Sequence, residues 1–547
     1  MLISKNKLDM KTKYNLIVLL CLFGLFSSCN DYLDHERPLL TNFSEAWETA
    51  DDAVMNATSC YVPLMWEWGS GFAPEWVFGD ICSDDAFTGG DSDGAMGEWM
   101  ELENFKTLSN NNTILRFYQW QYQGIMRCNL LLEQVPLMDP EAFVEDPALQ
   151  DRVIAEALFL RAMYYMRLVR IYGGVPLVTE VLKEQAGWRL PRASEAEIYA
   201  QIYTDLEAAI KNLPEKDGYA PKDLGRATKG AAKALLMRAY MNNAHRHNDM
   251  ELFSKTEKLG KEIINSGQYF LVSNYYDVFT VAGENGGESV FETQYVQEGT
   301  SDVWGGVGFS RGTLTVGMTR PPWSGGDAWG YNKPTKELYD TYEPGDYRRD
   351  VTIYEATLEQ VPANGGAALG VHFGNRYSSL KYALMNPDST WSTFGHISRA
   401  PINRKEIRYP DVLLMYAEAC VETNNLTEAK WALEQVRARA RANSADPATM
   451  LKPFPYGSYS DNANDLKQAI RHERRLELAM EGHRWFDLKR WNILAETMNE
   501  YRRTTHQEAV LMQEFVKGKH ELFPIPQIER DLNPMPQNPG YDGEPIR

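Results

Sequence analysis

Long stripes of apolar residues at helical spacing constrain the fold of this chain more than any other feature. From Val153 to Tyr172, apolar side chains recur at steps of three and four residues, which predicts one long amphipathic helix. Gly173 and Gly174 end this helix, and the following Val175-Pro176-Leu177 predicts an extended exit. Similar stripes recur along the chain, so helices are expected to dominate the fold.

Further helices are predicted to follow one another over short connections. Ser194 and Glu197 have the spacing of a capping box at the start of the next helix. The remaining helices are expected at 227–242, 251–266, 412–422 and 428–441. In the last pair, Thr427 is the predicted cap, and Leu426 and Trp431 are placed as a hydrophobic staple around it. Helix pairs of this size predict tetratricopeptide-like packing, although no pair meets the usual consensus of that repeat.

The N-terminal segment has the pattern of an export signal. Lysines precede an apolar run over residues 16–26 that is too short to span a bilayer as a permanent helix. Small residues then lead to Cys29, and this junction resembles the lipobox of bacterial lipoproteins, in which the cysteine is acylated. An uncleaved anchor helix and a buried apolar strand are the alternatives. We expect a signal peptide over 1–28, whether translation starts at the first or second methionine, and a lipidated tether over 29–45.

The predicted mature chain is strongly acidic. Removing residues 1–28 takes away four Lys and one Asp, which changes the formal net charge from −19 to −22. Such a surface disfavours nucleic acid and anionic membrane surfaces, because phosphates need Lys or Arg. No second apolar run approaches a membrane-spanning length, so lipid at Cys29 is the only expected membrane attachment. Asp31, Asp34 and Glu36 resemble the surface-export signal of Bacteroidetes lipoproteins; an ordinary flexible linker is the alternative.

The rest of the chain shows no clear division into parts. No linker rich in Gly, Ser or Pro and no block of charge interrupts residues 46–547, which are therefore expected to form a single domain. Its cysteines show no metal-ligand spacing such as C-x-x-C, so we expect buried apolar residues rather than ligands or a disulfide framework. They are Cys60, Cys82, Cys128 and Cys420.

Two segments, at about 60–110 and 280–400, depart from the helical pattern. They are rich in Gly, Pro, Asp and Asn and hold eight of the 14 tryptophans, so the large rings are concentrated on irregular chain. A sugar site needs such rings, because a ring face packs on C–H groups while polar side chains bond the hydroxyls. The alternative is that the rings fasten long loops to the helical body. The candidate ligand-binding residues are Trp66, Trp76, Asp84, Asp85, Trp99, Trp304, Trp323, Trp329 and Tyr331.

The ligand is expected between the segments 66–99 and 302–331. Trp329 and Tyr331 shortly precede Pro334, so the chain there is extended and cannot bury both rings in a helix stripe. Asp84 and Asp85 follow an apolar stretch and are placed to accept hydrogen bonds from sugar hydroxyls, with a structural role as the alternative.

No pattern points to catalysis. Glu473 and Glu477 lie four apart on one helix face, where like charges repel, so a structural network with neighbouring arginines is favoured over chemistry. The chain has no nucleophile elbow, phosphate-binding glycine loop or H-E-x-x-H motif. Asp84-Asp85 and the segment 91–94 match a calcium loop only in part, with a bound structural calcium ion as the alternative. We therefore expect no enzyme activity, no cofactor and no metal; a hydrolase is the last alternative.

Motifs of a known family run through nearly the whole predicted mature chain. They are AEALFLRA (155–162), YGGVPL (172–177), ESVFE (288–292), RYPDVLLMYAEA (408–419), ERRLELAMEGHRWFDL (473–488), FPIP (523–526), NP (533–534) and QNPGY (537–541). In this order they resemble the SusD/RagB family, surface lipoproteins that partner TonB-dependent transporters. The resemblance implies a mostly α fold, a SusD-like α/α superhelix. Four tetratricopeptide-like helix pairs would support an irregular, loop-rich ligand-binding half, and the C-terminal family region would span about 280–547.

The same resemblance implies a function. It describes a cell-surface glycan-binding lipoprotein of the outer membrane that captures oligosaccharide or polysaccharide and passes it to a SusC-like TonB-dependent transporter. In that family the helical side packs on the transporter. A peptide-binding lid of a RagB-like importer is one alternative. A tetratricopeptide-type scaffold without its own ligand is another, although it leaves the aromatic loops unexplained.

Overall fold

The fold is mostly helical, with 56% helix and 7% strand, as the sequence predicts. The structure is a computed structural model that describes residues 45–68, 71–90, 96–184, 188–296, 311–321, 328–356, 376–384, 400–505 and 511–546. Within the chain, residues 49–547 form one compact unit. Among the described residues, no helix combines the length and the apolar character needed to cross a membrane.

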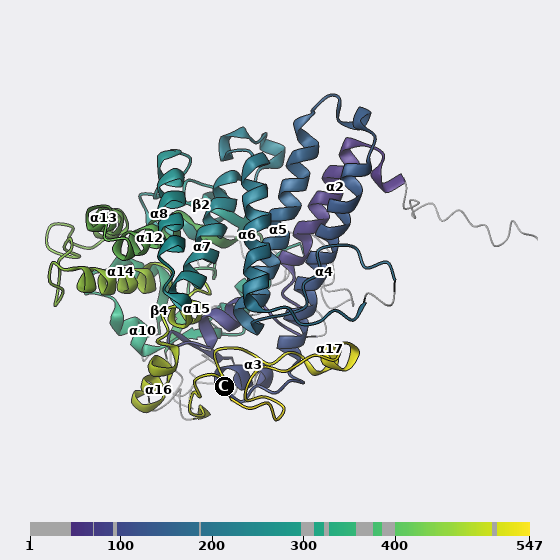
Figure 1. The fold of residues 1–547 in the computed structure, drawn as a ribbon. Coiled ribbons are helices and arrows are strands. Elements are labelled where there is room, and N and C mark those ends of the chain that lie inside the picture. Colours follow the sequence, from purple (N-terminus) through teal and green to yellow (C-terminus); the bar gives the residue numbers. More distant parts are fainter. Residues whose placement is uncertain are drawn as a thin grey trace, which may run out of the picture. The chain divides into compact units, whose positions relative to one another are not determined.

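Eight long helices of the described chain pack in succession, each against the next (Figure 1). They are α4 (Asn112–Gln134), α5 (Ala148–Tyr172), α6 (Glu195–Asn212), α7 (Lys229–His247), α8 (Met250–Asn265), α12 (Tyr409–Glu422), α13 (Leu426–Ala442) and α14 (Ala463–Glu477). An additional helix, α2 (Ala50–Tyr61), packs on α4 and α5. The succession gives the four helix pairs expected from the sequence. The irregular part is built by the chain before α4, between α8 and α12, and after α14.

The irregular part consists of short helices and three two-stranded antiparallel sheets. The sheets pair β1 (Ala86–Gly89) with β3 (Tyr331–Pro334), β2 (Ser289–Thr293) with β6 (Arg404–Arg408), and β4 (Ile353–Glu355) with β5 (Tyr377–Ser379). The short helices are α3 (Gly97–Glu103), α9 (Thr315–Thr319), α10 (Lys336–Thr341), α11 (Tyr347–Thr352), α15 (Arg484–Arg490), α16 (Leu494–Thr504) and α17 (Gln527–Leu532). A π-helical turn covers Val77–Ile81.

Several predicted helix ends are confirmed, whereas α7 runs to His247 and not only to residue 242. Helix α5 ends at Tyr172 because Gly173 adopts a φ of 73°, and Ser194 and Glu197 form both bonds of the predicted capping box. The predicted start of α13 is wrong. That helix begins at Leu426 with Asn425 at the N-cap, and the Asn425 amide donates to Glu257 on α8 at 2.8 Å rather than capping the helix.

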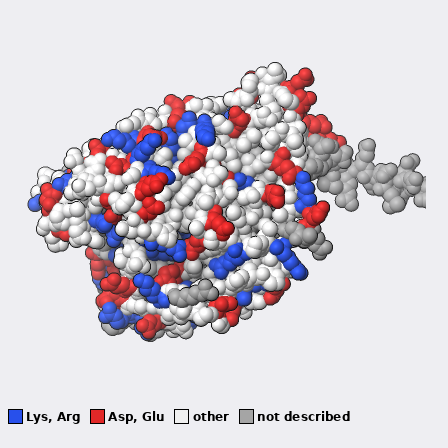
Figure 2. All heavy atoms as spheres, in the orientation of Figure 1, with Lys and Arg blue, Asp and Glu red and all other residues white. Residues whose placement is uncertain are grey.

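The predicted staple beside this start is also absent. Trp431 is 40% exposed, so its ring is not packed as a staple requires. All four cysteines of the predicted domain are free and buried, as predicted. On the face drawn in Figure 2, acidic and basic side chains are interspersed rather than gathered into one patch of a single sign.

A buried network of ion pairs ties α14 to the irregular part, as the sequence predicts. Glu473 and Glu477 are 0% exposed. Arg348 of α11 donates to Glu473 at 2.6 Å and to Glu477 at 3.2 Å. Burial alone would raise the pKa of Glu477, but Arg439, Arg408 and Arg348 outweigh it and lower this pKa to about 2. The acid pair is therefore structural and stays ionised.

Candidate functional site

Pairing of β1 with β3 brings the two predicted ligand-binding segments together. Gly89 lies opposite Tyr331, and Phe87 lies opposite Lys333. Next to this sheet lie four half-buried rings, Trp68, Phe72, Trp329 and Tyr331, which we call the aromatic platform.

The rings of the platform contact one another. Ring centroids are 6.2 Å apart for Trp68 and Phe72, 5.8 Å for Phe72 and Trp329, and 6.2 Å for Trp329 and Tyr331. Trp329 and Tyr331 are among the predicted ligand-binding residues, whereas Trp68 and Phe72 are not, although both are aromatic residues of the irregular segment 60–110. Trp304 and Trp323 lie outside the described residues.

Two buried tryptophans, Trp99 and Trp76, pack beneath the protein surface next to the platform; Trp99 contacts the platform directly. Trp99 on α3 is 0% exposed and packs edge-on against Tyr331 at 5.3 Å, and its Nε1–H donates to the Phe72 carbonyl at 3.1 Å. Trp76 is 5% exposed, packs on Trp99 at 5.2 Å and donates to the Thr315 hydroxyl at 3.2 Å. These bonds fix the loops on which the exposed ring surfaces lie.

The burial of these rings corrects part of the predicted site. Trp66, Trp76 and Trp99 were expected to contact the ligand, yet their faces are covered by the protein itself. Trp66 packs on Trp120 at 6.4 Å, and the Arg127 guanidinium lies 5.4 Å from its ring. Trp66 fastens its loop to α4 of the helical body, which is the alternative that the sequence left open, whereas Trp76 and Trp99 tie segments of the irregular part to one another.

Asp84 and Asp85 do not face a ligand either. Both are buried, and Arg484 of α15 holds Asp84 through two hydrogen bonds of 2.8 and 2.9 Å. Arg475 of α14 lies 3.0 Å from Asp84 and 2.6 Å from Asp85. Although burial raises the pKa of a carboxyl, these two arginines bring that of Asp84 below its ordinary range. The pair fastens β1 to the helices, so the prediction of sugar contacts at these positions is corrected.

A third carboxylate near the platform was missed by the sequence analysis. Asp80 is 1% exposed and accepts hydrogen bonds from the Asn332 amide at 3.1 Å and from the Gly482 N–H at 2.8 Å. No Lys or Arg forms an ion pair with Asp80 among the described residues, and burial raises its pKa to about 7. Asp80 thus links β3 to the turn before α15 without a compensating cation.

The described residues hold no recognisable metal site. No group of three or more His, Cys, Asp or Glu side chains is arranged around a common point in this part of the chain. The arrangement that remains is a surface of aromatic rings fixed on loops, which suits stacking on a flat, weakly polar ligand face.

Comparisons with known proteins agree with the sequence motifs. A model of the SusD family matches residues 287–541, and a second model, described as starch-binding associating with outer membrane, matches residues 83–241. SusD-like protein P2 of Formosa agariphila is 25% identical over 97% of this chain and 100% of its own length. A solved laminarin binding SusD-like protein has 28% identity and a TM-score of 0.74 over 90% of this chain and 100% of its own. Surface glycan-binding protein A from Bacteroides thetaiotaomicron has 25% identity and a TM-score of 0.72, over 90% of this chain and 99% of its own.

Proposed function

This chain belongs to the SusD/RagB family, and from that premise we propose that it is a cell-surface glycan-binding protein whose ligand lies on the aromatic platform. The observation that carries the proposal is the row of contacting, half-buried rings from Trp68 to Tyr331. The similarity to a laminarin binding SusD-like protein supports a glycan as the ligand class. Trp329 and Tyr331 are the residues proposed to stack on sugar rings.

We further propose that the protein is anchored to the outer membrane and works with a transporter. Acylation of Cys29 would hold it at the surface, and a SusC-like TonB-dependent transporter would receive the glycan. The outer-membrane association in the description of the second family model supports this location. The protein would act by binding and delivery, without catalysis.

Calorimetry with a panel of oligosaccharides, including laminarihexaose, tests the platform. Each stacked ring contributes on the order of 1–3 kcal/mol, so Trp329→Ala and Tyr331→Ala should each weaken binding of the glycan that the parent binds by roughly 5- to 150-fold. Trp431→Ala, which removes a ring that is 40% exposed on α13, is the matched control and should bind like the parent. Far-ultraviolet dichroism checks that each variant is folded. Parent-like binding by both platform variants would place the ligand elsewhere, and binding of peptides without any glycan would favour the RagB-like alternative.

Membrane fractionation tests the anchor. Cys29→Ala should release a folded protein from the outer membrane after a carbonate wash, because one acylated residue is the proposed attachment. Retention of this variant in the washed membrane would show that something other than lipid holds the protein. Purification of the tagged parent from native membranes should bring a large barrel protein with it, and an eluate without one would count against the transporter.

A further inference from the structure

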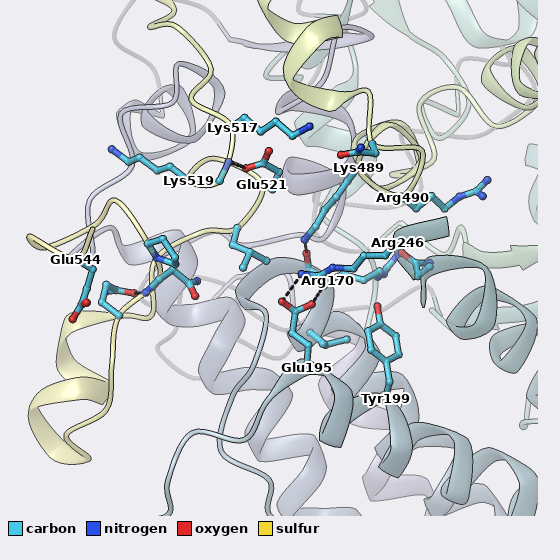
Figure 3. A pocket seen from close by; sticks show the side chains of 18 of the residues that line it. Arg170, Glu195, Tyr199, Arg246, Lys489, Arg490, Lys517, Lys519, Glu521 and Glu544 are labelled. Atoms are coloured by element: carbon cyan, nitrogen blue, oxygen red, sulfur yellow. Dashed lines mark hydrogen bonds and ion pairs between the residues drawn. The ribbon is translucent and has the colours of Figure 1, made fainter. Parts of the chain in front are cut away.

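A cavity of about 840 Å³ lies away from the aromatic platform (Figure 3). Its wall combines the last turn of α5, the first turns of α6, the end of α7, α15 and the C-terminal segment 517–545. Seven Lys or Arg residues line it against three Glu, although the whole chain has a formal net charge of −19. We call this cavity the basic pocket.

Three of the cations in the basic pocket have carboxylate partners. Arg170 pairs with Glu75 at 2.7 Å, Arg246 pairs with Glu195, and Arg490 pairs with Glu418 at 2.7 Å. These pairs hold the wall together and contribute little net charge. In Figure 3 dashed lines join the Glu195 carboxylate to the Arg246 guanidinium.

The other four cations form no ion pair with a carboxylate of the described residues. Arg192 donates to the carbonyl oxygens of Gly174 and Tyr172, and the Lys489 ammonium donates to the Arg170 carbonyl at 2.6 Å. Lys519 lies over the Tyr541 ring at 4.9 Å, and Lys517 is exposed.

Their positive charge is only partly offset. Two further carboxylates, Glu521 and Glu544, line the pocket, and Glu521 accepts a hydrogen bond from the Gly518 N–H at 2.8 Å. Burial, with the nearby Arg246 charge added, lowers the pKa of Lys489 to about 7. Burial is the larger cause of this shift; the Arg246 charge adds a positive potential that a bound anion would offset.

We propose that the basic pocket binds an acidic sugar residue, one that carries a carboxylate or a sulfate ester. The cavity lies in the size range of small-ligand sites, roughly 300–1,000 Å³. The Asn242 side chain and the Tyr199 hydroxyl also line it, and these suit sugar hydroxyls, whereas the Asn538 amide is taken up by the Tyr172 and Phe523 carbonyls. Large apolar anchors, which protein partners need at the centre of an interface, are few. The inference rests on the proposed function, since it adds a second subsite to a glycan-binding protein.

Binding of three named probes tests the proposal. Oligogalacturonate supplies carboxylates, a κ-carrageenan oligosaccharide supplies sulfate esters, and laminarihexaose is neutral. At least one acidic probe should bind the parent protein, and raising NaCl from about 50 to about 500 mM should weaken it, because the interaction is between charges. The double variant Lys489→Gln/Lys517→Gln should weaken that binding at least about tenfold. Glutamine at 489 retains a donor for the Arg170 carbonyl, which protects the fold.

The control variant is Lys211→Gln/Lys258→Gln, which removes two exposed lysines of α6 and α8 outside the pocket. It should bind the acidic probe like the parent. Equal loss in both double variants, or acidic binding no tighter than neutral binding, would overturn the inference. An aspartate-rich peptide that binds more tightly than both acidic sugars would also overturn it, in favour of a protein partner.

The outcomes separate this inference from the proposed function. Neutral glycan binding that depends on Trp329, together with no binding of acidic probes, would refute the basic pocket and support the platform. Acidic binding that depends on the two lysines and not on Trp329 would support the pocket and refute the platform. No binding of any glycan would refute both.

Discussion

Two regions of this molecule are rich in basic side chains, and they differ in whether those side chains are paired with carboxylates. Around Glu473 and Glu477, buried acids are met by arginines from α11, α13 and β6 at hydrogen-bond distance. In the basic pocket, Arg192, Lys489 and Lys517 have no carboxylate partner among the described residues. Both regions combine Arg or Lys with Glu side chains. The number of partners, rather than the type of residue, separates a cluster that holds the fold together from one that is ready for a ligand.

The paired region should be sensitive to the loss of one partner. Arg348 is 0% exposed and meets Asp346 at 2.7 Å and Glu473 at 2.6 Å. Replacing it with Met leaves these acids poorly compensated, and we expect the free energy of unfolding to fall by about 3–5 kcal/mol. Denaturant unfolding of the chain without its signal peptide and Cys29 measures the change.

The neighbouring arginine provides the control. Arg349 is partly exposed and pairs with Asp350 at 3.1 Å, so Arg349→Met should cost less than about 1 kcal/mol. Similar losses in the Arg348 and Arg349 variants would mean that burial of the network does not matter for stability.

Asp80 differs from both regions, because it is a buried carboxylate that has no ion-pair partner among the described residues. Its pKa is about 7 in the folded protein against an ordinary 3.8, so the folded state binds this proton more tightly than the unfolded chain. The stabilisation is complete below pH 3.8 and is lost as the pH rises to about 7, with a slope of at most about 1.4 kcal/mol per pH unit.

Asp80→Asn should remove this slope. The buried Asn332 Oδ1 has no hydrogen-bond partner in the described structure and can accept from the new amide once the Asn332 side chain turns over. Measured at intervals between pH 4 and pH 7, the free energy of unfolding of the parent minus that of the variant should decrease as the pH rises. Parallel curves would mean that Asp80 is ionised throughout this range.

The ease of prediction from sequence differs between the same regions. The acid pair of the network could be identified because Glu473 and Glu477 lie on one helix, where a spacing of four residues fixes their face. The helices and the capping box at Ser194 were predictable for the same reason, since they depend on neighbours in the chain. The basic pocket draws its residues from separate segments, including α5, α15 and the C-terminal segment, and no local pattern connects them.

The candidate ligand site was predicted in part: less completely than the ion-pair network, but better than the basic pocket. The two aromatic segments were expected to lie on either side of the ligand, but the burial of Trp99 depends on its packing against Tyr331, which the sequence does not display. Asp84 was assigned to the ligand because its partner, Arg484, lies far along the chain. The arginine-rich motif at 473–488 was the available signal, since those charges needed acids from somewhere.

Lys489 should take up a proton when an anionic ligand binds in the basic pocket. Lys489 has a pKa of about 7, so at pH 7.5 much of it is neutral, and a bound anion should raise this pKa. Binding of the acidic probe should therefore take up a fraction of a proton per site. Calorimetry in two buffers of different ionisation enthalpy measures this uptake, and Lys489→Gln should abolish it. Uptake that persists in the variant would assign the proton to another group.

The smallest expected effect concerns the stability of the protein when the basic pocket is empty. Lys517 is exposed, has no ion-pair partner among the described residues, and lies two positions from Lys519 on the pocket wall. Lys517→Gln should therefore leave the free energy of unfolding unchanged or raise it by up to roughly 0.5 kcal/mol at low salt, because it relieves repulsion between like charges. The gain should vanish in high salt, and Lys211→Gln should show none. A loss of more than about 1 kcal/mol would mean that Lys517 stabilises the fold as the network arginines do, and the contrast between paired and unpaired clusters would fail.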